Sequence, residues 1–294
     1  MTRRGGLSVA VILMYGLLVG GSGVAAAGDG PAPDTLGTSP TLSGLSGLAV
    51  TASARTLPPW SMAVGADALY SHLHSPGADH AEGRLSVGLG LPNRVELAAL
   101  LPAVRTVNDD LNPELPPTGT GVGDLQLAAK WRALHEDETL WPALALAAVV
   151  TLPTGQRSKE LRTVDDYGVE VKAITSADID FIPDQFALGL YANIGYFFQD
   201  VGRATEEKHA TYAFGAALPL LARAGRPFLS PLQVLLEMDG TFKRRDDQDY
   251  VTVTPSVRYV GPVTVTAGFQ YTVFAHSTID AGVGGVVQIG VSFL

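Results

Sequence analysis

At 294 residues the chain is long enough for one large domain or two small ones, and length alone decides neither. Apolar residues make up 46% and charged residues only 17%, below the roughly 25% of typical soluble domains. The absence of cysteine excludes disulfides, thiol chemistry and cysteine-ligated zinc, and the net charge of −9 argues against a nucleic-acid partner.

The N-terminus has the pattern of an export signal. Arg3 and Arg4 precede an apolar run over 7–19, and small residues follow that end in Ala25-Ala26-Ala27. A basic region, an apolar region and an A-x-A site are typical of a secretory signal peptide, which we predict for residues 1–27, with an uncleaved membrane anchor as the alternative. Cleavage would leave 18 basic and 29 acidic residues, a net charge of −11.

Residues 28–58 are rich in Gly, Ala, Pro, Ser and Thr and show no sustained period. We predict that they form a flexible N-terminal extension in the periplasm. The alternative rests on the repeated leucines of residues 42–48, which could place a short segment inside the domain that follows.

From Trp60 onward, apolar and polar residues alternate. Over 250–260, valines and a tyrosine alternate with threonines, a serine and an arginine, so one face of the predicted strand is apolar and the other polar. Pro255 interrupts this strand and predicts a bulge or local unpairing. The same test yields predicted strands near 59–70, 83–91, 93–104, 122–133, 141–152, 167–177, 184–198, 210–219, 228–241, 250–260, 262–274 and 283–294.

These segments have about the 9 to 11 residues that a tilted transmembrane strand needs. No stretch after residue 27 approaches the ~18 to 20 apolar residues of a membrane helix, and only helices and closed barrels satisfy the backbone in lipid. We therefore predict an all-β, antiparallel transmembrane β-barrel over 59–294 with about 12 strands, 10 or 14 being alternatives. A soluble β-sandwich or lipocalin-like barrel would expose apolar patches far above the usual few hundred Å².

The connections and the aromatic residues fix an orientation. Odd-numbered connections are long and polar and even-numbered ones are mostly shorter, as in outer-membrane barrels with short periplasmic turns and long outer loops. Both termini then lie in the periplasm. Aromatic residues fall at both strand ends, as two interfacial girdles would: Trp60, Trp131, Trp141, Tyr259 and Phe293 at the periplasmic end, and Tyr70, Tyr167, Phe198 and Tyr250 at the outer end.

Motifs of catalysis and metal binding are absent. The sequence has no G-x-S-x-G or H-E-x-x-H pattern, and its histidines and paired carboxylates fall mostly in predicted outer loops. We predict no cofactor, no metal and no enzyme activity. A barrel lipase using His276 and Ser277 is a third hypothesis. It ranks last because adjacent strand residues point to opposite faces, so this pair is poorly placed for catalysis.

Charges of both signs gather on the predicted inward face, where they would either line a narrow polar channel or pair and close it. The candidate lumen-lining residues are Asp67, Glu96, Asp124, Glu170, Glu237 and Asp239, with Arg84, Arg94, Lys130, Arg132, Lys172 and Arg258.

Residues 121–132 (GVGDLQLAAKWR), the strand end TLPTG at 151–155, and GLGLPNRVEL at 88–97 resemble the barrel family of the meta-cleavage pathway of phenol degradation. That resemblance implies an outer-membrane transporter. Some members of the family are linked to the uptake of aromatic hydrocarbons. One departure is the terminus, where such barrels commonly end in an aromatic residue and this chain ends Phe293-Leu294.

We therefore expect a pore or transporter that passes small molecules passively, hydrophobic or aromatic ones among them, with outer-membrane lipid as its surroundings. A closed structural or partner-binding barrel is the alternative.

Overall fold

The computed structural model describes residues 39–41, 44–73, 79–108, 118–134, 142–156, 164, 167–182, 186–201, 205–219, 232–243, 250–275 and 282–293. The predicted signal peptide lies outside these residues. No described helix is long and apolar enough to cross a membrane.

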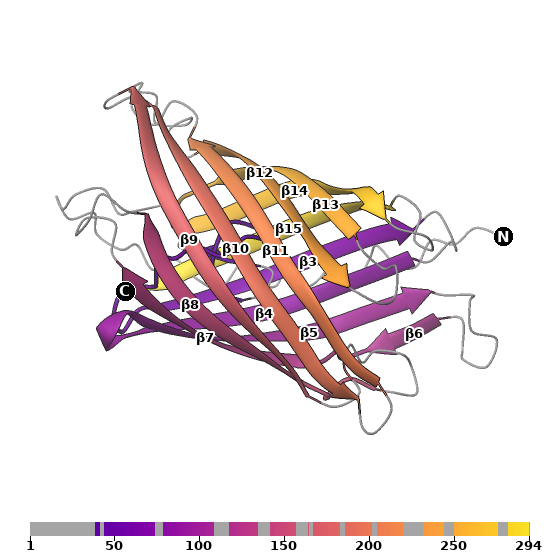
Figure 1. Cartoon of the computed structure of the whole chain (residues 1–294). Helices are drawn as coiled ribbons and strands as arrows, with labels where there is room; N and C mark the ends of the chain where they lie inside the picture. Colours follow the sequence, from indigo (N-terminus) through magenta and orange to yellow (C-terminus); the bar gives the residue numbers. More distant parts are fainter. Residues whose placement is uncertain are drawn as a thin grey trace. The chain divides into compact units, whose positions relative to one another are not determined.

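The described chain is almost entirely antiparallel sheet (Figure 1). A two-stranded ladder, β1 (Ser39–Pro40) with β2 (Ser46–Gly47), precedes the main sheet. The main sheet consists of β3 (Met62–Leu73), β4 (Asp79–Leu91), β5 (Val95–Asn108), β6 (Thr118–Gly121), β7 (Leu125–Leu134), β8 (Ala143–Leu152), β9 (Gly168–Ile182), β10 (Phe186–Val201), β11 (Thr205–Pro219), β12 (Leu232–Lys243), β13 (Tyr250–Tyr259), β14 (Val263–Ala275) and β15 (Gly282–Phe293).

The sheet closes on itself. Each strand pairs with its sequence neighbour, and β15 returns to pair with β3 over the full length of both strands. The short β6 and the longer β7 both pair with β5, end to end, so together they occupy one position in the ring. The structure is therefore a closed barrel of 12 antiparallel strands, as predicted.

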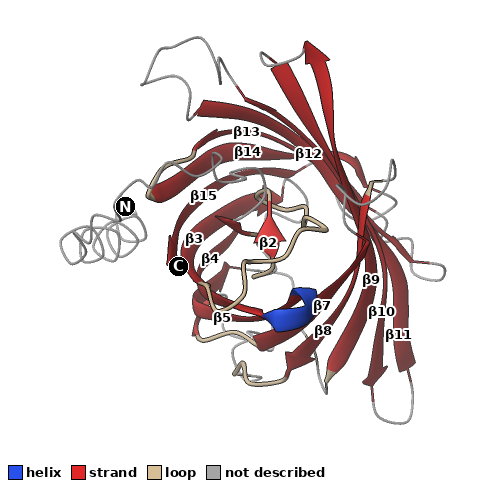
Figure 2. Ribbon diagram, turned by 90° about the vertical axis from the view of Figure 1, so that its left-hand side faces the viewer, coloured by secondary structure: helices blue, strands red, loops and turns tan. Residues whose placement is uncertain are grey.

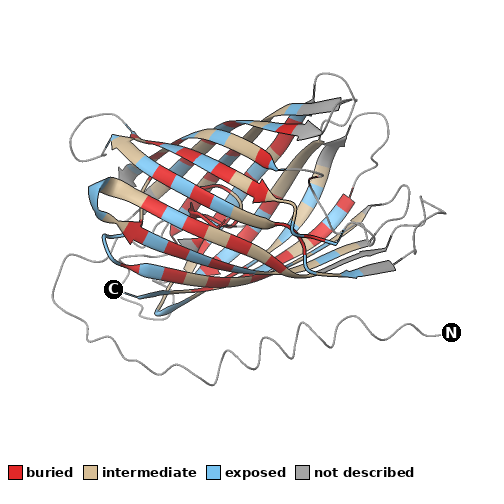
Figure 3. Cartoon of the chain, turned by 90° about the horizontal axis from the view of Figure 1, so that it is seen from below, coloured by how far each residue is buried: buried red, intermediate tan, exposed pale blue. Residues whose placement is uncertain are grey.

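Buried and exposed residues alternate along the strands and give the wall a chequered pattern (Figure 3). On β13, Thr254, Ser256 and Arg258 are buried while Val257 and Tyr259 are exposed. This confirms the predicted faces: the outside of the barrel is apolar and the inside is largely polar. Phe269, on the neighbouring β14, is 72% exposed and is among the most exposed large apolar side chains.

The N-terminal segment occupies the inside of the barrel. Figure 2 shows β2 within the ring of strands, and Leu45, Leu48, Ala49 and Ala52 are buried there. The predicted extension outside the barrel is therefore wrong for residues 44–58, and the alternative of an internal segment is what the structure shows. Residues 44–58 are the inner segment of the barrel.

Strands β9, β10 and β11 extend beyond their predicted ends, which weakens the predicted loop asymmetry. Residues 202–204 alone join β10 to β11 at the predicted outer end, whereas 220–231 separate β11 from β12 at the other. Thr254 and Pro255 of β13 have no register partner on β14. This agrees with the predicted unpairing at Pro255, since proline has no N–H to donate.

Candidate functional site: the occupied lumen

One anchor of the inner segment is a buried ion pair on the barrel wall. Glu96 of β5 and Lys130 of β7 are register partners, and Lys130 Nζ lies 3.1 Å from Glu96 Oε2. The Glu96 carboxylate also accepts hydrogen bonds from the N–H and hydroxyl of Ser46, both at 2.7 Å, and from the N–H of Leu57 at 3.0 Å. Lys130 donates to the Ser46 hydroxyl and to the carbonyl of Arg55, both at 2.7 Å. The pair therefore holds both ends of the segment.

A second anchor lies on the opposite side of the ring, on β12 and β13. The Glu237 carboxylate accepts hydrogen bonds from three consecutive backbone N–H groups, those of Ala49 at 3.2 Å, Val50 at 2.9 Å and Thr51 at 2.7 Å. Arg258 donates to the carbonyl of Gly47 at 3.2 Å and to Thr266 at 3.1 Å. Charge-assisted bonds of this kind are about twice as strong as neutral ones, so the turn is fixed from this wall as well.

Further contacts extend the attachment around the ring. Arg55 Nη2 lies 2.6 Å from Asp178 Oδ2 on β9, and Gln288 on β15 donates to the carbonyl of Pro40. Leu48 packs in a buried cluster with Tyr191 and Leu235. Pro40, which precedes the inner segment, and the inner segment itself thus contact strands around the whole ring.

Glycines in the wall leave room for this close approach. A Cβ added to Gly215 of β11 would lie 2.7 Å from Leu48 Cδ1, and one added to Gly90 of β4 would lie 2.0 Å from the Pro58 carbonyl oxygen. Contacts under 3.0 Å are essentially never made by a real Cβ. A side chain at Gly90 would displace the backbone of residues 57–58, whereas one at Gly215 would require the Leu48 side chain to move.

Other predicted lumen residues pair with one another along the wall. Arg84 Nε lies 2.5 Å from Asp67 Oδ1, and Lys172 Nζ lies 3.0 Å from Glu170 Oε2. Asp124, between β6 and β7, accepts hydrogen bonds from the N–H groups of Gly155 at 2.7 Å and Val164 at 3.1 Å. Asp124 therefore joins Gly155 and Val164, two described residues that follow β8.

The remaining three candidates differ in placement. Arg94 lies in the short 3-10 turn Pro92–Arg94 with a φ of 64°, where a strand was predicted. Arg132 is partly buried on β7, and Asp239 lines a cavity between β12 and β15. Tyr250, predicted for the outer aromatic girdle, lines the same cavity. Trp60, Trp131, Tyr70 and Tyr167 are exposed, while Trp141 lies outside the described residues.

Nothing in the sequence indicates that Ser46 and the run Ala49-Val50-Thr51 are partners of the charged wall. Three of these groups act through their backbone N–H, which every residue except proline carries, so their side chains give no signal. Within the described part of the chain, no group of three or more metal-ligating side chains could hold a metal ion.

A closed barrel with an apolar outside, a charged inside and its own N-terminal segment in the lumen has the architecture of a bacterial outer-membrane barrel. A family model matches residues 84–289, and the chain belongs to that family, described as "Putative MetA-pathway of phenol degradation". No curated protein matches.

Among solved structures, the barrel is similar to the COG4313 outer membrane channel from Pseudomonas putida F1, with a TM-score of 0.58 and 14% identity over 81% of this chain and 97% of that one. That likeness shows the fold. The NanC porin (TM-score 0.46, 10% identity, 76% of this chain and 98% of that one) and the CymD monoaromatic hydrocarbon channel (0.42, 10%, 81% and 89%) also match, at scores too low to support an argument.

Proposed function

We propose that this protein is an outer-membrane channel for small hydrophobic molecules, aromatic ones among them, and that its inner segment closes the lumen to water-filled passage. The channel is non-enzymatic and passive, and a signal peptide over residues 1–27 directs its export. The observation that carries the proposal is the pair of buried anchors, Glu96 with Lys130 and Glu237 with Arg258, which hold one segment from opposite walls.

The apolar outer wall supports the membrane location, because its exposed residues have the pattern of lipid contacts in outer-membrane barrels. The family's link to phenol degradation and the channel function of the similar COG4313 protein point to a small aromatic solute. A general porin fits less well, since larger barrels leave an open aqueous channel and here the inner segment takes that place.

The alternative is a closed structural barrel, which the same occupied lumen would favour. Two measurements separate the possibilities. Uptake of a radiolabelled hydrophobic aromatic compound, such as toluene, is measured in Gram-negative cells that carry the protein and in cells that lack it. Single-channel conductance in planar bilayers is measured for the wild type and for Glu237→Gln.

For a channel closed by its inner segment, we expect protein-dependent uptake, a small wild-type conductance and more frequent open events in Glu237→Gln. Glu170→Gln, whose partners Thr211 and Lys172 belong to the wall, is the matched control and should conduct like the wild type. Absence of protein-dependent uptake together with unchanged conductance in Glu237→Gln would reject the channel and leave the structural barrel.

A further inference from the structure

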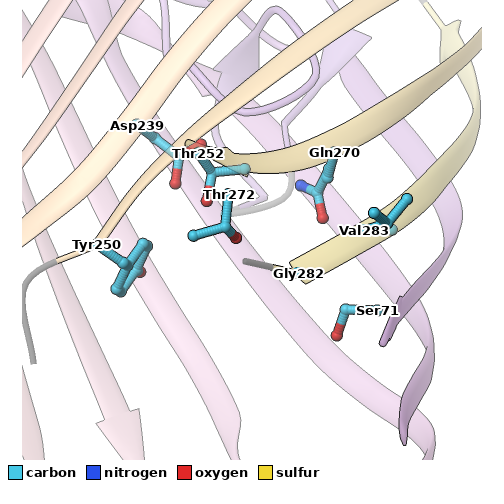
Figure 4. A pocket seen from close by; sticks show the side chains of 9 residues that line it. Ser71, Asp239, Tyr250, Thr252, Gln270, Thr272, Gly282 and Val283 are labelled. Carbon is cyan, nitrogen blue, oxygen red and sulfur yellow. The ribbon is translucent and has the colours of Figure 1, made fainter. Parts of the chain in front are cut away.

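Strand residues of the barrel wall, Asp239 among them, line a cavity of about 290 Å³ (Figure 4). Five adjacent strands contribute to it, from β12 through β15 to β3. Its surface is largely apolar, and the polar side chains that reach it are Ser71, Asp239, Tyr250, Thr252, Gln270 and Thr272. A cavity of this size accepts a one-ring molecule, at the lower limit of the ~300 to 1,000 Å³ of drug-sized pockets.

Asp239 supplies the charge of this cavity. It lies two residues from Glu237 on the same face of β12, hence about 6.6 Å further along the wall, and Figure 4 shows its carboxylate beside Thr252 and Thr272. Its Oδ1 is buried and has no hydrogen-bond partner among the described residues. A buried polar atom without a partner destabilises the folded state, and a ligand that donates to it would remove that cost.

The neighbouring cations already have partners. Lys172 is 3.0 Å from Glu170, and Arg258 donates to Gly47 and Thr266. Among the described residues, no cation of the wall therefore lies at contact distance from the Asp239 carboxylate. Around it stand hydroxyl and amide oxygens that can accept from a donor, and the ring of Tyr250, whose face attracts cations.

We propose that this cavity binds the ammonium group of a small organic amine, with Asp239 as the counter-charge and Tyr250, Thr252, Gln270 and Thr272 around it. The inference deepens the proposed channel function and rests on it, since it names a solute class: an apolar body with a cationic head.

The experiment uses the folded full-length protein in a non-ionic detergent and isothermal titration calorimetry at pH 7. Three probes share one ring and differ in the head group: benzylamine is cationic, benzyl alcohol is a neutral donor and benzoate is anionic. We expect benzylamine to bind at least about tenfold more tightly than benzyl alcohol, because a bond to a charged group is the stronger one. Benzoate should not bind.

Asp239→Asn keeps the shape and removes the charge. We expect it to weaken benzylamine binding at least about tenfold and to leave benzyl alcohol nearly unchanged. Glu82→Gln is the matched control: it removes a carboxylate from the barrel wall on β4, outside the cavity lining, and should bind benzylamine like the wild type. Should Asp239→Asn fail to fold, Gln270→Leu tests the same cavity, and its benzylamine affinity should fall.

Equal binding of benzylamine to the wild type and Asp239→Asn would overturn the proposal, and so would an equal loss in Glu82→Gln. Displacement of benzylamine by calcium chloride alone would reassign the cavity to an inorganic cation. Protein-dependent uptake of toluene would survive each of these results, so a failure here is distinguishable from a failure of the channel function.

Discussion

Glu96 and Lys130 lie opposite each other on β5 and β7, with side chains that are 0% exposed and charged atoms 3.1 Å apart. Bringing two charges out of water costs free energy, which their attraction offsets only when the remaining donors and acceptors are also satisfied. Here the inner segment satisfies them, through Ser46, Arg55 and Leu57. The wall pair and the segment therefore stabilise each other.

Lys130→Met removes one partner of this buried pair. We expect the free energy of unfolding to fall by about 3 to 5 kcal/mol, because the Glu96 charge is left buried and unpaired. Urea unfolding in lipid vesicles measures the change. The double variant Glu96→Gln/Lys130→Met should recover part of the loss.

The control is Lys172→Met, which breaks a pair of similar length whose side chains are 14% and 17% exposed. Partial contact with water should make its loss smaller. Equal losses in the free energy of unfolding for the two lysine variants would show that burial of the Glu96–Lys130 pair does not determine how much its loss destabilises the barrel.

Glu237→Gln replaces a carboxylate that accepts three backbone N–H bonds by an amide with one acceptor oxygen. We expect the inner segment to leave the lumen more often, and trypsin, which is too large to work inside a barrel, to cleave after Arg55 several-fold faster. Mass spectrometry of the released fragment measures the rate. Glu170→Gln is the control, and identical rates in wild type and Glu237→Gln would contradict the anchoring role.

The barrel was predictable because alternation repeats in every strand. Phe269 and Val257 point outward and Thr266 and Arg258 inward, as the period of two requires. Strand ends were less predictable, since the strands extend into polar connections that carry no apolar face. Tyr250 was predicted to belong to the outer aromatic girdle because it lies at a strand end. Its side chain instead points to the same face of β13 as that of Thr252, two residues away, and both line the cavity.

The inner segment was the part that the sequence could not place. Its attachment depends on backbone N–H groups meeting Glu237 and on small wall residues around Leu48, and neither leaves a periodic pattern. The charged candidates were more informative, since Glu96, Lys130, Glu237 and Arg258 all lie inside the barrel. What the sequence could not reveal is that their partners include the N-terminal segment as well as one another.

Phe269→Arg and Gln270→Arg test the two faces of β14 at adjacent positions. Phe269 is exposed on the outer wall, whereas Gln270 lines the cavity that holds Asp239. Arginine on the lipid side near the midplane costs about 2 to 4 kcal/mol, so Phe269→Arg should reduce the folded fraction seen as heat-modifiable migration on gels. Gln270→Arg should fold, and equal behaviour of the two would mean that the faces are wrongly assigned. Leu188→Arg on β10, again an outward position, should repeat the Phe269 result.

Gly90 and Gly83 lie on the same strand, β4, and differ in what a methyl group would meet. At Gly90 an added Cβ would lie 2.0 Å from the Pro58 carbonyl oxygen and 2.8 Å from that of Leu57, whereas at Gly83 the nearest atoms are 4.0 Å away.

Because the obstruction at Gly90 is backbone, Gly90→Ala must move residues 57–58. It should strain the bonds that join Gly90 to Trp60 and Ser61, at 2.7 and 2.9 Å, and the bond from Leu57 to Glu96. We expect a loss of about 1 to 3 kcal/mol in unfolding free energy together with more frequent open events in planar bilayers, because the end of the inner segment is released. Gly83→Ala should be neutral or stabilise by up to about 1 kcal/mol, since alanine restricts the unfolded chain, and its conductance should match the wild type. If Gly90→Ala were as stable and as closed as Gly83→Ala, residues 57–58 could not be packed against β4 as described. The closure of the lumen would then have to depend on the Glu237 anchor and on the bonds of Ser46 and Arg55 to the Glu96–Lys130 pair.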